Sequence, residues 1–116
     1  MNTQIITVLI ASAKHTENLE WCFDRALADL TEKTRVFYEE HHKYADRIAE
    51  THKDEPMTPE YAILHEESGD AYKLCEMIAH ELHEREENGE KLAHFDGADF
   101  GKLIDEAFDK GQAEAK

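Results

Sequence analysis

The chain has 116 residues, of which 27 are Asp or Glu and 13 are Lys or Arg, so its net charge is −14 when every histidine is neutral. This length fits one domain, and a hydrophobic content of 41% is enough for a folded core. The excess of carboxylates excludes direct binding to a nucleic-acid phosphate backbone and disfavours an anionic membrane surface. No apolar run approaches the roughly 20 residues needed to span a bilayer.

The first segment, residues 4–13, is apolar and rich in β-branched side chains. It ends in Ala-Ser-Ala and so resembles a signal peptide with its cleavage site, but it lacks the basic residues that open such a peptide. We therefore expect folded structure here. Its apolar residues can continue the face of the segment that follows, which predicts a helix that breaks between Ala13 and Thr16.

A long stretch without helix breakers comes next, because the first proline is Pro56 and the first glycine is Gly69. Apolar residues recur within it at steps of three, four or seven, which is the period of one helical face. They are Leu19, Phe23, Ala26, Leu30, Phe37, Tyr44 and Ile48. The pattern predicts a helix from Thr16 to His52, about 55 Å long at 1.5 Å per residue.

Residues 53–58 indicate a turn, after which Thr58, Pro59 and Glu60 supply an N-cap, a proline at the first helical position and an early acid. A second helical face follows, formed by Tyr61, Leu64, Ser68, Ala71, Cys75, Ile78 and Leu82. Gly69 lies inside this helix and costs about 1 kcal/mol relative to alanine. Asn88-Gly89 is expected to end it. A last short helix is predicted from Phe100, Leu103, Ile104, Ala107 and Phe108.

The predicted fold is all-α: a long antiparallel helical hairpin with shorter terminal helices, in a single domain covering residues 1–116. A hairpin this thin cannot bury both long faces by itself. Either the terminal helices fold back over it, or a second copy of the chain completes the bundle, and we expect a homo-oligomer. Trp21 lies off the apolar face of the first long helix, so either the N-terminal helix covers it or it contacts a partner.

Eight histidines are the second unusual feature of the composition. Glu76, His80 and His83 are spaced by four and three residues, so they share one helical stripe, which His65 and Tyr72 extend. Imidazole and carboxylate groups at this spacing can bind Zn or Fe. The alternative is that they are ordinary solvated residues of an acidic helix. The HExxH signature of zinc peptidases is absent.

Catalytic motifs are also absent from the sequence. Neither serine lies in GxSxG, and no phosphate-binding GxxxxGK[ST] or GxGxxG loop is present. Cys22 and Cys75 lie on or beside apolar faces without a CxxC pattern, which is typical of inert thiols in a reducing cytoplasm. We therefore expect a cytoplasmic protein without enzymatic activity and without a cofactor, unless the His/Glu stripe binds metal.

The charge is distributed unevenly along the chain. From Thr58 onward there are 16 acids and 6 bases, so ten of the fourteen excess negative charges lie there. An acidic helical surface attracts basic partners in a salt-dependent way. The leading hypothesis is a small binding module, an inhibitor or adaptor of the kind that mobile elements encode. It docks on a basic protein surface, including one that itself binds nucleic acid. The residues expected to form the docking face are Trp21, Glu81, Glu84, Glu86 and Glu87. A metal-binding helical bundle is the competing hypothesis.

Overall fold

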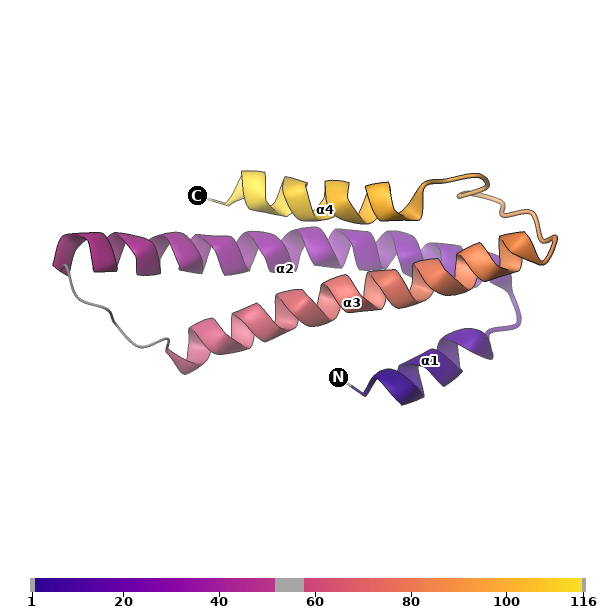
Figure 1. The fold of residues 1–116 in the computed structure, drawn as a ribbon, viewed down its shortest axis with the longest axis horizontal. Helices are drawn as coiled ribbons and strands as arrows, with labels where there is room; N and C mark the ends of the chain where they lie inside the picture. Colours follow the sequence, from indigo (N-terminus) through magenta and orange to yellow (C-terminus); the bar gives the residue numbers. More distant parts are fainter. Residues whose placement is uncertain (1, 52–57, 116) are drawn as a thin grey trace.

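The computed structural model describes residues 2–51 and 58–115, and within these ranges it contains helices and no strand. The helices are α1 (Thr3–Ala11), α2 (Thr16–Thr51), α3 (Pro59–Glu87) and α4 (Phe100–Glu114) (Figure 1). The all-α class, the long helices and a break before Thr16 are confirmed, although α1 ends at Ala11, two residues before the predicted break. The turn predicted just before Thr58 falls on residues 52–57, outside the described part of the chain. No described helix has both the length and the apolar character that crossing a membrane requires.

The ends of α3 follow the signals in the sequence. The Thr58 hydroxyl accepts a hydrogen bond from the Tyr61 backbone N–H at 3.1 Å, and Pro59 occupies the first helical position, where a missing N–H costs nothing. Gly89 adopts a left-handed conformation with φ of +99°, which ends the helix after Asn88. Local chemistry therefore fixes the length of α3.

The four helices form an elongated bundle measuring 58 × 27 × 17 Å. Helices α2 and α3 run antiparallel, α4 returns along α2 and also touches α3, and α1 folds back beside the second half of α3 (Figure 1). Both terminal helices thus fold back along the hairpin (Figure 1).

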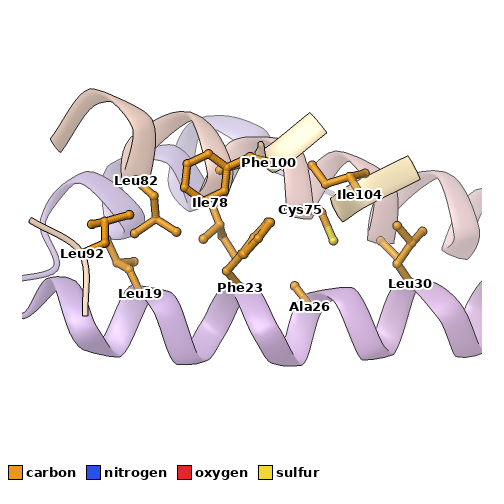
Figure 2. Packing of buried hydrophobic residues seen from close by; sticks show 12 residues of the cluster. Leu19, Phe23, Ala26, Leu30, Cys75, Ile78, Leu82, Leu92, Phe100 and Ile104 are labelled. Atoms are coloured by element: carbon orange, nitrogen blue, oxygen red, sulfur yellow. The ribbon is translucent and has the colours of Figure 1, made fainter. Parts of the chain in front are cut away.

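The main core lies where α2, α3 and α4 meet (Figure 2). The predicted faces of both long helices supply it, and Leu92 from the α3–α4 connection closes one end. Its buried side chains are Leu19, Phe23, Ala26, Leu30, Ala71, Cys75, Ile78, Ala79, Leu82, Leu92, Phe100 and Ile104. Phe23 lies at its centre and makes edge-to-face contacts with Phe95 and Phe100 at 5.2 and 5.4 Å between ring centroids.

One carboxylate is buried at the edge of this core. Glu20 of α2 is 1% exposed. Its Oε1 accepts hydrogen bonds from the backbone N–H groups of His94 and Phe95 at 2.8 and 2.9 Å, and its Oε2 accepts one from Ala93 at 3.3 Å. A buried charge is tolerated only when such bonds replace water. Glu20 therefore holds the connection, residues 88–99, against α2 and sets where α4 begins.

Helix α4 approaches α2 closely at Gly111. A β-carbon added there would lie 2.4 Å from the Thr31 carbonyl oxygen and 2.7 Å from the Thr34 β-carbon. Next to this crossing, the Thr31 hydroxyl donates a hydrogen bond to the Ala107 carbonyl at 3.0 Å. Because backbone atoms stand in the way, α4 lies flat on α2 only with glycine at this position.

Gly111→Ala is expected to lower the free energy of unfolding by about 1–3 kcal/mol, because the added methyl group pushes α4 away from α2. Chemical denaturation monitored by circular dichroism measures the change. Gly101→Ala, on the same helix, is the matched control, since its β-carbon would meet nothing closer than 3.7 Å. Equal stability of the two variants would contradict the close crossing.

Glu20→Gln keeps the shape of the side chain but removes its charge and one of its two acceptor oxygens. We expect a loss of about 2 kcal/mol in stability, because three backbone donors then lose charge-assisted partners. Amide hydrogen exchange should speed up at residues 93–95 before it does so elsewhere in the core. Asp24→Asn, exposed and one turn further along α2, should change stability by less than about 0.5 kcal/mol. Unchanged exchange at 93–95 would argue against the anchoring role.

Candidate functional site

Residues 76–87 of α3 and Glu90, which lies just beyond the C-cap of this helix, carry most of the local acidity. Residues 76–90 hold six glutamates and a single Lys or Arg, which is Arg85. Arg85 points inward: its Nε donates to Glu81 Oε1 at 3.0 Å, its Nη1 to the Thr16 hydroxyl at 3.1 Å and its Nη2 to the Ala13 carbonyl at 2.7 Å. Its side chain is 12% exposed. Arg85 thus holds the junction of α1 and α2 in place. The outer surface of residues 76–90 therefore carries carboxylates without a Lys or Arg.

Two of the four glutamates expected to dock on a partner are used inside the molecule. Glu81 pairs with Arg85, and its side chain is 17% exposed. Glu86 accepts a hydrogen bond from the Gly97 backbone N–H at 2.9 Å, so it holds the connection to α4. Both carboxylates therefore stabilise the fold, and their negative charge adds to the local field without facing a partner directly.

The other two glutamates are exposed, and each pairs with a histidine one turn earlier on α3. Glu84 Oε1 lies 3.3 Å from His80 Nε2, and Glu87 Oε1 lies 3.0 Å from His83 Nε2. All four side chains are more than half exposed. Such exposed pairs contribute little to stability, so these carboxylates are available to a cationic partner.

Trp21 lies on the outer side of α2 and is 55% exposed. Its ring packs against His94 of the α3–α4 connection in a tilted contact, with 4.6 Å between ring centroids and 47° between ring planes. His94 Nε2 lies 3.1 Å from Glu17 Oε1. Of the two alternatives for Trp21, cover by the N-terminal helix is not found, because α1 packs beside α3. Arg85 holds α1 there through the carbonyl of Ala13.

The structure does not bring Trp21 and the exposed glutamates onto one face. Trp21 precedes the buried Phe23 by two residues, and Glu84 follows the buried Leu82 by two residues. Two residues correspond to about 200° around a helix, so each side chain points away from the α2–α3 interface. Since they belong to opposite helices of the hairpin, they lie on opposite sides of it.

The stripe suggested for metal binding lines a groove between α3 and the start of α4. Glu76, His80 and His83 form the α3 side of this groove of about 390 Å³, and Asp99 lies on its α4 side. The rings of His80 and His83 turn to different carboxylates, as described above. Within residues 2–51 and 58–115, no three His, Cys, Asp or Glu side chains come close enough to hold a metal ion.

A second groove lies further along α3 and α4, is aromatic, and is also lined by two residues of α2. It has a volume of about 260 Å³ and is lined by Phe37, Tyr38, His65, Ser68, Gly69, Tyr72 and Phe108. The rings of Tyr38 and Tyr72 both stand nearly perpendicular to Phe108, at 81° and 89°. A β-carbon at Gly69 would have nothing within 4 Å, so the glycine leaves the groove open at this point.

Tyr72 joins the two grooves, because it lines the aromatic groove and lies one turn before Glu76 on α3. Its hydroxyl donates a hydrogen bond to Asp105 of α4 at 3.2 Å. Burial, and after it this hydrogen bond, raises the pKa of Tyr72 above its usual value, so the hydroxyl stays protonated at neutral pH. We refer to the residues that line both grooves, together with Asp105, as the α3–α4 seam.

The sequence showed one side of this seam and missed the other. The stripe from His65 and Tyr72 to His83 was recognised by its spacing on α3. Asp99, Asp105 and Phe108 of α4 were not, since no local pattern tells which face of a short helix meets α3. One local signal of the groove was present in the sequence: Gly69, because a glycine inside a helix lowers its stability. The structure places Gly69 in the lining of the aromatic groove.

Comparisons with family models, with curated proteins and with solved structures return no match to this chain. The functional argument therefore depends on the geometry and charge of the chain itself.

Proposed function

We propose that the protein is a small, non-catalytic binding module that docks its acidic α3 surface and the α3–α4 seam on a basic surface of a partner protein. The observation that carries the proposal is the inward turn of Arg85. It removes the single Lys or Arg of residues 76–90 from the outer surface, where Glu76, Glu84 and Glu87 are exposed. A surface of one sign attracts a partner of the opposite sign and speeds its association.

The seam supports a more specific mode of binding. Its first groove places the carboxylates of Glu76 and Asp99 around a polar hollow. Its second groove offers the rings of Tyr38, Tyr72 and Phe108. Lysine and arginine side chains are attracted to carboxylates and also to the faces of aromatic rings. A partner segment with two or three cationic side chains can therefore place one in each groove.

The class of partner follows from the charge. A protein surface that binds the phosphate backbone of a nucleic acid is basic, and an acidic module that covers it competes with the nucleic acid. An inhibitor or adaptor acting on such a protein is the role that we propose. The unpaired state of Cys22 and Cys75 supports action in a reducing compartment such as the cytoplasm. We further propose that the module works as a homo-oligomer.

Metal binding has less support than docking. Glu76, His80 and His83 share one wall of a groove, as their spacing predicted. However, the two imidazoles pair with separate carboxylates at 3.3 and 3.0 Å instead of converging on one point. Docking on a basic protein can use Glu76, His80 and His83 without requiring their side chains to converge on one point.

The partner can be sought by capture from a cell lysate on the immobilised full chain, followed by mass spectrometry. We expect a basic protein to bind at about 50 mM salt and to be largely released at about 500 mM, where charges are screened within about 4 Å. The binding constant of the purified partner is then measured by titration calorimetry across this range. Binding that ignores salt would contradict docking by charge.

The triple variant Glu76→Gln, Glu84→Gln and Glu87→Gln is expected to bind the purified partner about 10-fold more weakly at low salt, with a shallower dependence on salt. The matched control removes three exposed carboxylates from α2, as Asp24→Asn, Asp46→Asn and Glu50→Gln. It changes the net charge equally but leaves the α3 surface intact. If both triple variants lose the same affinity, net charge alone drives binding, and the proposed surface is wrong.

Gly69 allows the aromatic groove to be tested apart from the fold. Gly69→Ala should raise stability by about 1 kcal/mol, because its methyl group enters open space in a helix interior. Gly69→Leu should be similarly stable but should fill the groove and weaken partner binding by about 10-fold, since one cationic side chain then loses its aromatic contacts. Thermal unfolding and calorimetry measure the two effects. Normal binding by the leucine variant would exclude the aromatic groove from the docking site.

A further inference from the structure

The first thirteen residues differ from the rest of the chain in charge. They contain no Asp, Glu, Lys, Arg or His, although the whole chain carries a net charge of −14. Residues 2–13 form α1 with its N-cap and the start of its link to α2. Any second molecule with the same charge would be repelled by most of this protein, and α1 offers an approach free of like charges.

Helix α1 carries no charged side chain and is mostly apolar, yet only one side of it is covered. Ile10 and Ala13 pack on the main core. On other sides of the helix, Ile5, Val8 and Leu9 are 57%, 66% and 63% exposed. Helices that are hydrophobic all round are normally buried, and adjacent exposed aliphatic side chains mark interaction sites. We call these three residues the α1 ridge.

A groove adjoins this ridge where α1 meets α2 and α3. Its volume is about 560 Å³, and nearly all of its lining is apolar. The lining residues are Leu9, Ile10, Ala13, Leu19, Cys22, Arg25, Ala26, Asp29, Leu74 and Ile78. Leu9 belongs to both features, so an apolar ridge and an apolar groove lie side by side on one molecule. A surface with both can bind its own copy in a closed two-fold arrangement.

Only two charged residues, of opposite sign, line the groove, and both come from α2. Arg25 makes no ion pair with any other described residue, whereas Asp29 lies 4.0 Å from Lys33 in a loose, exposed pair. The two are one helical turn apart. In a two-fold dimer the contact of residue 25 with residue 29 occurs twice, so a cation and an anion one turn apart are electrostatically self-complementary.

We propose that a second copy of this chain covers α1: the α1 ridge of each copy enters the groove of the other, and Arg25 faces the partner subunit's Asp29. A basic protein finds no carboxylate on α1 to attract it, and an anionic lipid surface is repelled by a chain of charge −14. A second copy would bury the apolar ridge, fill the apolar groove and give Arg25 an ion-pair partner at the same time. The α3–α4 seam uses other residues and stays open in this dimer.

Sedimentation equilibrium of the full chain tests the proposal. We expect a mass of two chains at about 100 μM and dissociation on dilution. Val8→Glu and Leu9→Glu should each raise the dimer dissociation constant by about 100-fold or more, because each buries an unpaired carboxylate. The matched control is Ile63→Glu, since Ile63 of α3 is also aliphatic and 54% exposed but lies outside the ridge and groove. It should leave the dimer intact.

Charge exchange tests the orientation of the two copies. Arg25→Glu should weaken the dimer, and adding Asp29→Arg should restore it, because the swapped pair again matches across the two-fold axis. Cys22 gives an independent readout, since it is exposed in the single chain and lines the groove. Its reaction with a thiol reagent should slow as protein concentration rises. Cys75 does not interfere, because burial raises its pKa to about 12.

A wild-type chain that stays monomeric at about 100 μM would overturn the proposal. So would a dimer that survives Leu9→Glu, or one that Ile63→Glu disrupts equally. If a monomeric wild type instead binds neutral phosphatidylcholine vesicles, and Leu9→Glu abolishes that binding, the ridge belongs to a lipid surface and the second copy is excluded. Failure of charge exchange to restore a Leu9-dependent dimer would overturn the proposed pairing of Arg25 with Asp29.

Discussion

The burial of one carboxylate, Glu20, is the constraint on which the rest of the arrangement depends. A charge removed from water must find hydrogen-bond donors, and among the described residues Glu20 finds the backbone N–H groups of residues 93–95. Satisfying them pulls the α3–α4 connection onto α2. That contact inserts Leu92 and Phe95 at the end of the core and starts α4 where it can return along α2 to the crossing at Gly111. Without that return, the α3–α4 seam would have no second wall.

Charge is divided by role in this protein. The charges that hold the fold point inward: Glu20 and Glu86 anchor the connection, and Arg85 with Glu81 fastens the junction of α1 and α2. Outside, residues 76–90 present the exposed carboxylates of Glu76, Glu84 and Glu87 and no outward-facing lysine or arginine. Because Arg85, the single Lys or Arg of residues 76–90, stabilises the fold from inside, the outer surface of this segment is acidic.

The helical faces and helix ends could be predicted from the sequence because interactions between residues close in the chain determine them. The period of apolar residues gave the faces of α2 and α3, and Thr58, Pro59 and Gly89 gave the ends of α3. The stripe of Glu76, His80 and His83 was also correctly placed on one side of a helix. The sequence could not predict which other helix each of these helical faces would contact. Trp21 shows this, because its ring meets His94, seventy-three residues away, and not the neighbouring α1.

The sequence by itself determined an all-helical chain, the limits of α3, the buried faces of the two long helices and a net charge of −14, since each follows from spacing, capping or composition. Only the tertiary structure decided which charges are internal and which face solvent. It separated Trp21 from the glutamates, turned Arg85 away from them and brought α4 alongside the α3 stripe. These outcomes depend on contacts between residues far apart in the chain. The backbone N–H groups of residues 93–95 must reach the buried Glu20 carboxylate, and α4 must cross α2 at Gly111.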